Sequence, residues 1–140
     1  MANIQTPNGS GLTVVLVDDE PHITHMVARK LMQCGFTVHT AMDGQQGLSK
    51  ILEVMPDLVV TDLQMPYMSG IELATRLFNS AKMSHIPVIM LTARGFAIEA
   101  QIQELTNIKS LLSKPFGTKA LIDLIAKTLS GGAGEMERCA

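Results

Sequence analysis

Short apolar runs alternate along this chain with segments of helical periodicity, and this alternation constrains the fold more than any other feature. The apolar runs span residues 14–17, 58–61, 88–91 and 108–112, and the segment 36–40 is a fifth strand-like stretch in which apolar and polar residues alternate. Apolar runs of this length are typical of strands buried in a parallel sheet, whose crossover connections are usually helices. The sequence therefore predicts the α/β class, with a doubly wound five-stranded parallel sheet and helices on both faces.

Helix signals fall between and after these runs. We expect helices over residues 21–33, from the turn at 43–44 to about 53, over 69–79, more weakly over 96–105, and over 118–129. Pro21 suits the first position of a helix, and Ser69 and Thr118 suit N-caps. The polar residues 1–11 and the Gly-rich residues 130–140 are expected to be flexible ends of a single domain.

The composition excludes several classes of protein. Of the 140 residues, 46% are hydrophobic but only 4% are aromatic, so the core must be aliphatic. A net charge of -2 argues against a surface for nucleic acid or anionic membranes. No apolar run approaches the roughly 20 residues of a membrane span, and the polar N-terminus lacks the layout of a secretory signal. We therefore expect a cytoplasmic protein without direct membrane or nucleic-acid contacts.

Polar residues follow the predicted strands at positions suited to phosphoryl chemistry. Asp18 and Asp19 follow the first strand and Asp62 follows the third. Thr92 follows the fourth strand, and Lys114 comes shortly after the fifth. The carboxyl ends of parallel strands meet at one edge of the sheet, where ligands bind. The sequence thus predicts a crevice that holds carboxylates, a hydroxyl and an ammonium group.

Such a crevice suits a divalent cation and a phosphoryl group. Crowded carboxylates repel one another unless a positive charge neutralises them, and Mg²⁺ prefers oxygen ligands of this kind. Lys114 can bind a phosphoryl oxygen, and one carboxylate can act as a nucleophile that forms an aspartyl-phosphate. Taken alone, each piece has a plainer explanation, since an Asp pair often caps a helix and Lys-Pro often marks a loop.

Four motifs appear in order along the chain. They are Val17-Asp18-Asp19-Glu20, Thr61-Asp62 followed by Met65-Pro66, Leu91-Thr92-Ala93, and Ser113-Lys114-Pro115-Phe116. Together they resemble the receiver domain of two-component response regulators, a CheY-like module. The resemblance covers residues 12–129 and implies the flavodoxin-like, CheY-like (βα)5 fold. Agreement of separate motifs in both order and spacing makes the resemblance specific.

The resemblance implies a role for each residue of the crevice. Asp62 would be the phosphoacceptor, and Thr92 and Lys114 would bind the phosphoryl group. The Mg²⁺ ligands would be Asp18, Asp19, Asp62 and the backbone carbonyl of Gln64. The peptide bond between Lys114 and Pro115 would be cis.

The resemblance also implies partners and a mode of action. A sensor histidine kinase or a histidine phosphotransfer protein would supply the phosphoryl group. The phosphorylated domain would then switch its contacts with an output protein, or pass the phosphoryl group on in a phosphorelay. It would not be an enzyme, although it would catalyse its own phosphorylation and dephosphorylation. Gln64 and Arg94 lie two residues after Asp62 and Thr92, where side chains can influence how long the phosphoryl group persists.

Two departures from the family fall where output or dimerisation often takes place. Leu111 stands where many members carry an aromatic residue, and residues 104–108 replace a common Gly-Ala step. The last predicted helix also has a broad apolar set, which fits either partly exposed flanks or the surface of a phosphorylation-dependent dimer. The set consists of Leu121, Ile122, Leu124, Ile125 and Leu129.

Alternative interpretations remain at this stage. The chain could be a receiver excised from a larger regulator with an output domain, although its last residues alone are too few to form one. It could be a Mg²⁺-dependent phosphohydrolase that uses an aspartyl-phosphate, a class with its nucleophile and acid two residues apart on the first strand. It could also be a flavodoxin-like binding module without phosphoryl chemistry. Asp62, Thr92 and Lys114 together fit a receiver better.

Overall fold

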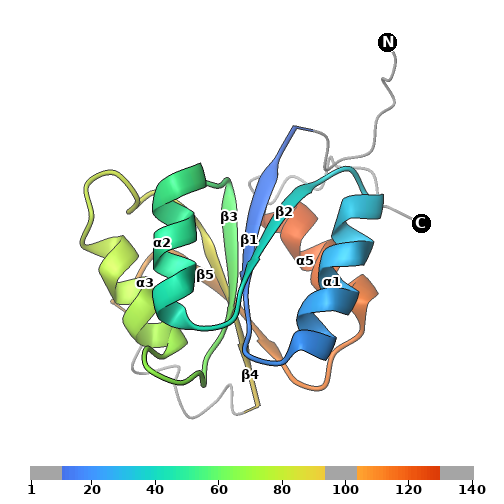
Figure 1. Cartoon of the computed structure of the whole chain (residues 1–140). Helices are drawn as coiled ribbons and strands as arrows, with labels where there is room; N and C mark the ends of the chain where they lie inside the picture. Colours follow the sequence, from blue (N-terminus) through green and yellow to red (C-terminus); the bar gives the residue numbers. More distant parts are fainter. Residues whose placement is uncertain (1–10, 94–103, 130–140) are drawn as a thin grey trace.

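A computed structural model describes residues 11–93 and 104–129 and shows one sheet between two layers of helices (Figure 1). The elements are β1 (Thr13–Val17), α1 (Pro21–Gln33), β2 (Thr37–Ala41), α2 (Gly44–Val54), β3 (Leu58–Asp62), α3 (Gly70–Phe78), β4 (Val88–Thr92), β5 (Ile108–Ser113) and α5 (Thr118–Leu129). The strand order is β2-β1-β3-β4-β5, and each neighbouring pair is parallel. The predicted α/β class and five-stranded parallel sheet are confirmed.

Some predictions fall outside the described residues. They are Arg94, residues 96–103 of the helix predicted over 96–105, residues 1–10 of the predicted N-terminal segment, and the whole segment 130–140. Within the part of the chain that the structure describes, no helix combines the length and the apolar character that a membrane span requires.

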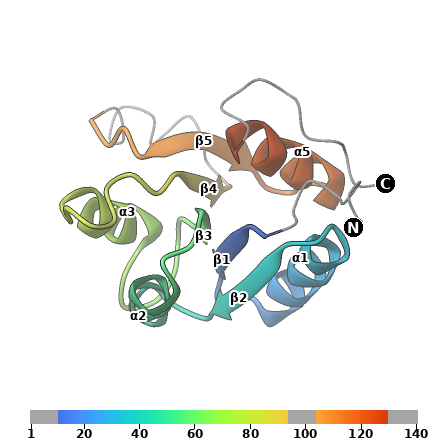
Figure 2. The ribbon, with the colours of Figure 1, turned by 90° about the horizontal axis from the view of Figure 1, so that it is seen from above.

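Two apolar clusters form the core, one on each face of the sheet. Helices α2 and α3 cover one face, and α1 and α5 cover the other (Figure 2). Strand β3 contributes to both clusters because successive side chains point to opposite faces. Val59 packs in the cluster that contains Leu73 of α3, whereas Val60 packs in the cluster that contains Leu31 of α1 and Leu121 of α5.

The helix starts agree with the sequence except at α5. The Ser69 hydroxyl accepts a hydrogen bond from the Glu72 N–H at 3.1 Å and so acts as the predicted N-cap of α3. The N-cap predicted at Thr118 is wrong, because Thr118 already lies inside α5. The Gly117 carbonyl instead accepts a hydrogen bond from the Leu121 N–H at 3.3 Å, and glycine is acceptable at an N-cap.

Strands β3, β4 and β5 each extend one polar residue beyond the predicted apolar run. Asp62 pairs in register with Leu91, and Thr92 pairs with Ser113. The ladder is formed by backbone groups, so a polar side chain at a strand end does not interrupt it. As a result, Asp62 and Thr92 occupy the last ladder positions of their strands, where the sheet itself holds them.

Candidate functional site

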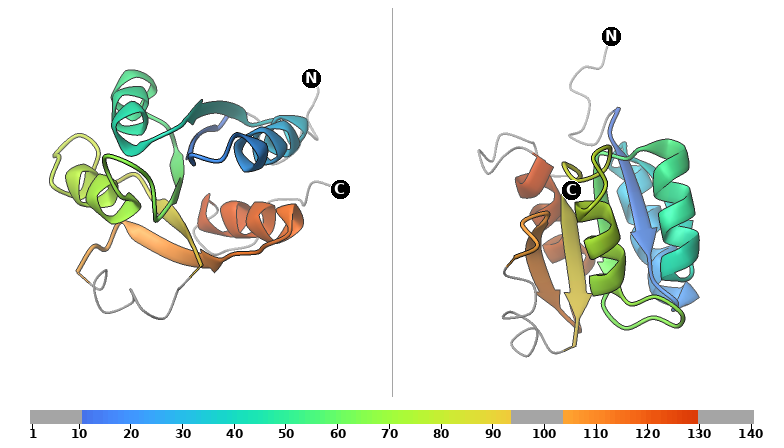
Figure 3. Two further views of the ribbon diagram at one scale, coloured as in Figure 1. Left: turned by 60° about the horizontal axis from the view of Figure 1, so that its bottom comes forward. Right: turned by 90° about the vertical axis from the view of Figure 1, so that its left-hand side faces the viewer.

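The candidate site lies at the edge of the sheet where the carboxyl ends of the strands meet. The strand arrows in Figure 3 point toward this edge. Strand β1 leads into Asp18 and Asp19, β3 ends at Asp62, and Lys114 follows β5 directly. The sheet thus gathers residues that lie far apart in the sequence, as the strand pattern predicts.

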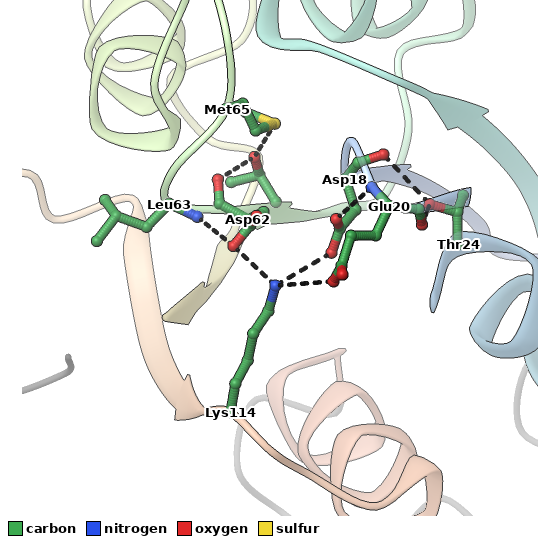
Figure 4. Close-up of polar contacts among 8 residues, drawn as sticks. Asp18, Glu20, Thr24, Asp62, Leu63, Met65 and Lys114 are labelled. Atoms are coloured by element: carbon green, nitrogen blue, oxygen red, sulfur yellow. Dashed lines mark hydrogen bonds and ion pairs between the residues drawn. The ribbon is translucent and has the colours of Figure 1, made fainter. Parts of the chain in front are cut away.

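Asp62 is almost buried, at 7% exposure. Its Oδ1 accepts a hydrogen bond from the Leu63 N–H at 2.9 Å and forms an ion pair with Lys114 Nζ at 3.1 Å (Figure 4). Burial raises the pKa of the Asp62 carboxyl above its usual value, and the hydrogen bond and charge of Lys114 offset only part of that effect. The carboxylate is therefore held in place and remains poorly solvated.

Asp18 is fully buried in the loop between β1 and α1. Its Oδ1 accepts a hydrogen bond from the Glu20 N–H at 2.9 Å. Its Oδ2 has no hydrogen-bond partner, and Lys114 Nζ lies 3.6 Å away from it. Burial raises the pKa of the Asp18 carboxyl, the Glu20 hydrogen bond lowers it in part, and the charge of Asp62 raises it again.

The carboxylates of Asp18, Asp19 and Asp62 form a cluster in which the candidate ligand oxygens all lie within 4.8 Å of one another. Asp19 is exposed, whereas its two partners are buried. Among the described residues, the ion pairs bring one ammonium group to this cluster, that of Lys114. The excess negative charge, the oxygen-only donor set and the unpartnered Oδ2 of Asp18 fit a hard divalent cation such as Mg²⁺.

Lys114 joins the strands of the site. Its N–H donates to the Thr92 carbonyl at 2.8 Å, and its peptide bond to Pro115 is cis, as expected. Burial alone would lower the pKa of the Lys114 ammonium. The hydrogen bond to Asp62 and the charges of Asp18, Asp62 and Glu20 outweigh burial and raise that pKa, so the lysine keeps its proton.

The remaining predicted residues lie at the same edge. Thr92 is 1% exposed at the end of β4, and Gln64 is an exposed residue of the loop after β3. The proposed contacts of the Thr92 hydroxyl and of the Gln64 carbonyl stay predictions. Leu111 is partly buried and packs against the cluster beneath α2 and α3.

Sequence reasoning missed three polar residues. Glu20 belongs to the first motif, and its Oε1 lies 3.9 Å from Lys114 Nζ, a contact that the motif does not indicate. The Thr24 hydroxyl contacts the backbone of the acidic loop, which consists of residues 18–20. Asn107, at the site of the missing Gly-Ala step, is buried and donates from Nδ2 to the Ala74 carbonyl of α3 at 3.0 Å. The sequence signal for Thr24 is its spacing, because it lies three, four and seven residues before the apolar Val27, Ala28 and Leu31 on the same side of the helix.

Comparisons with known proteins agree with this geometry. A family model for the response regulator receiver domain matches residues 14–126. The phosphate regulon transcriptional regulatory protein PhoB of Pseudomonas aeruginosa is 36% identical over 129 residues, which are 91% of this chain and 56% of that protein. The chain spans about half the length of the bacterial transcriptional regulators that it matches.

Solved structures show the same fold. The chemotaxis response regulator CheY4 of Vibrio cholerae superposes with a TM-score of 0.76 at 28% identity, over 83% of this chain and 97% of that one. The response regulator TrrA of Thermotoga maritima, solved in complex with Mg(2+)-BeF, gives a TM-score of 0.73 at 28% identity, over 84% of this chain and 98% of that one. Sequence, fold and the acidic edge of the sheet agree: the chain belongs to the response regulator receiver domain family of two-component signalling.

Proposed function

We propose that this receiver domain accepts a phosphoryl group on Asp62 from a histidine kinase or a histidine phosphotransfer protein. The observation that carries the proposal is the buried Asp62 carboxylate, bound to Lys114 beside two further carboxylates. Burial strips water from the carboxylate, and the sheet fixes its direction. Both features favour a nucleophile that reacts with a partner held at the sheet edge.

The proposed step is a displacement at phosphorus. A carboxylate oxygen of Asp62 forms a bond to the phosphorus atom of the partner's phosphohistidine as the phosphorus–nitrogen bond breaks. The electron pair of that bond stays on the imidazole, and the product is an aspartyl-phosphate. Lys114 is 3.1 Å from Asp62 before transfer, so its ammonium can shift to a phosphoryl oxygen after it.

Mg²⁺ bound by the acidic cluster would neutralise negative charge on the phosphoryl oxygens. Asp18, Asp19 and Asp62 would hold the cation, with the Gln64 carbonyl as the further predicted ligand. The complex of TrrA with Mg(2+)-BeF supports this assignment by relationship. Since phosphoryl transfer requires positioning and charge neutralisation above all, the arrangement of these residues suits the reaction.

We propose a switch rather than an enzyme with turnover. Phosphorylation would shift an equilibrium between two conformations, and a partner that prefers one of them would respond. The relatives include DNA-binding transcriptional regulators, which supports a regulatory switch over an enzyme with turnover. The phosphorelay role, the phosphorylation-dependent dimer and the cytoplasmic location remain predictions of this proposal.

Intact-protein mass after incubation with Mg²⁺ and acetyl phosphate tests the phosphoacceptor. We expect the wild type to gain one phosphoryl group, and this gain to disappear when EDTA replaces Mg²⁺. Asp62→Asn should gain none. Asp57→Asn is the matched control at the opposite end of β3, and it should be modified like the wild type.

Three outcomes would decide against parts of the proposal. An adduct that persists in Asp62→Asn would place the acceptor elsewhere. No adduct, together with no Asp62-dependent release of phosphate from acetyl phosphate, would reject phosphoryl chemistry at this site. Sustained turnover of phosphomonoesters would favour the phosphohydrolase alternative.

A further inference from the structure

Thr24 is a buried polar residue on the inner side of α1, at 4% exposure. Its hydroxyl lies 2.9 Å from the Glu20 carbonyl oxygen and 3.2 Å from the Asp18 carbonyl oxygen (Figure 4). The hydroxyl carries a single proton, which it shares between the two carbonyl oxygens on either side of Asp19. This side chain thus contacts the backbone of the acidic loop without contacting its carboxylates.

The acidic loop is held at other points as well. The Asp18 N–H donates to the Ala41 carbonyl at 3.1 Å, which ties the start of the loop to β2. The Glu20 N–H donates to Asp18 Oδ1 at 2.9 Å, and the Thr24 N–H donates to the Glu20 carbonyl at 3.1 Å. The Thr24 hydroxyl adds a side-chain hydrogen bond from α1 to the Asp18 carbonyl.

We propose that Thr24 is a positioning residue for the cation site: its buried hydroxyl bridges the Asp18 and Glu20 carbonyls and so fixes the backbone that carries Asp19. The inference rests on the proposed function and deepens it. Asp19 is the exposed member of the acidic cluster, so its carboxylate depends most on the backbone beneath it. Groups that orient metal ligands often affect metal affinity strongly without contacting the metal.

Two other threonines provide matched controls. Thr75 in α3 and Thr128 in α5 each donate a hydroxyl hydrogen bond to the carbonyl four residues earlier, at 2.7 Å and 2.8 Å. Thr24 donates in the same way to the Glu20 carbonyl but shares the proton with the Asp18 carbonyl. A difference between Thr24→Val and the two control substitutions therefore measures the contact with the acidic loop, apart from the general loss of a helix hydroxyl.

The test measures Mg²⁺ affinity by calorimetry on the full chain, with urea unfolding of the metal-free protein beside it. Thr24→Val should bind Mg²⁺ about tenfold more weakly than the wild type, the lower end of what loss of a ligand-orienting group costs. Thr24→Ser keeps the hydroxyl and should stay within about twofold. Thr75→Val and Thr128→Val should bind like the wild type. Thr24→Ala serves as a second variant if valine prevents folding.

A readout without metal tests the same idea. Amide hydrogen exchange in EDTA should accelerate at Asp19 and Glu20 in Thr24→Val, and it should not accelerate there in Thr128→Val. If the wild type binds Mg²⁺ and Thr24→Val binds it with equal affinity, the positioning role of Thr24 is overturned but the proposed cation site is not. Absence of Mg²⁺ binding by the wild type would overturn the proposed cation site and this inference with it.

Discussion

Two aspartates mark the two ends of β3 and have opposite surroundings: Asp57 directly precedes the strand, and Asp62 is its last residue. Asp57, before the strand, is exposed, and its Oδ2 accepts a hydrogen bond from the Thr13 N–H at 2.8 Å. Its own N–H donates to the Thr13 carbonyl at 2.8 Å. Asp62, at the other end, is almost buried beside two further carboxylates.

This difference shows how the fold separates a solvated structural carboxylate from a buried one that is crowded by other carboxylates. Asp57 closes the gap between the starts of β1 and β3, and water screens its charge. Asp62 and Asp18 are removed from water with too little positive charge beside them, which costs free energy in the folded state. A ligand that supplies the missing charge can recover this free energy, so the unfavourable end of β3 is the end suited to binding.

A substitution at Gly70 should disturb the Asp62 end of β3 most strongly. A Cβ at this position would overlap the Asp62 backbone oxygen and the Met90 sulfur. We expect Gly70→Ala to lower the free energy of unfolding in urea by about 3 kcal/mol, the upper range for overpacking. Gly117→Ala, where a Cβ meets no atom within 4 Å, should cost less than about 1 kcal/mol. Similar losses in both variants would contradict the close approach.

Added Mg²⁺ should distinguish the two ends of the strand. At 100 times its Kd, Mg²⁺ should stabilise the wild type by about 2.7 kcal/mol, because it binds the folded state. Asp62→Asn and Asp18→Asn should lose most of that gain, whereas Asp57→Asn should keep it. Urea unfolding with and without Mg²⁺ measures these values. A full gain in Asp62→Asn would mean that the cation binds elsewhere.

Asp18→Asn should stabilise the metal-free protein at neutral pH. Burial raises the pKa of Asp18 in the folded state, so the folded protein holds this proton more tightly than the unfolded chain does. The stability linked to Asp18 is therefore full below the ordinary aspartate pKa of about 3.9 and is lost as pH rises through the folded-state pKa.

In EDTA, we expect Asp18→Asn to gain about 1 kcal/mol at pH 7, the lower end of the cost of an unpaired buried polar atom. The gain should shrink as pH falls toward 4. Urea unfolding of both proteins across this range provides the measurement. A gain that grows on acidification would reverse the assigned direction of the pKa shift.

Asp57→Ala should have the smallest effect. The substitution leaves the Thr13 N–H without its carboxylate partner, but water can replace it at this exposed position. We expect a loss of about 0.5–1 kcal/mol and an unchanged gain from Mg²⁺. Thermal unfolding with and without Mg²⁺ tests both statements, and a reduced Mg²⁺ gain would show that the two ends of β3 are coupled.

Much of the fold was predictable from the sequence because its signals are local. Apolar runs located every strand to within about one residue, and Pro21 and Ser69 marked helix starts from their own backbone preferences. Convergence of Asp18, Asp62 and Lys114 followed from one rule about parallel strands. The ends of β3, β4 and β5 were set one residue short because the apolar pattern stops before the backbone ladder does.

The contacts of Glu20, Thr24 and Asn107 were not predictable, because each depends on how separate elements pack. The hydroxyl of Thr24 is useful only where α1 lies against the acidic loop. The amide of Asn107 is useful only where β5 begins beside α3. Periodicity can place Thr24 on the inner side of α1, but it cannot identify the groups that these side chains contact, so the roles required the structure.

The order in which the chain is made gives a last consequence to the arrangement of the site. Asp18 and Asp62 are synthesised well before Lys114, whose place in the fold is set by the pairing of β5 with β4 and by the hydrogen bond from its N–H to the Thr92 carbonyl. Until then, the growing polypeptide carries the acceptor carboxylate without its ammonium partner. Non-local parallel pairing of this kind is intrinsically slow to form. Under the proposed function, a newly made receiver therefore has its complete phosphoryl-binding site only once β5 is in place.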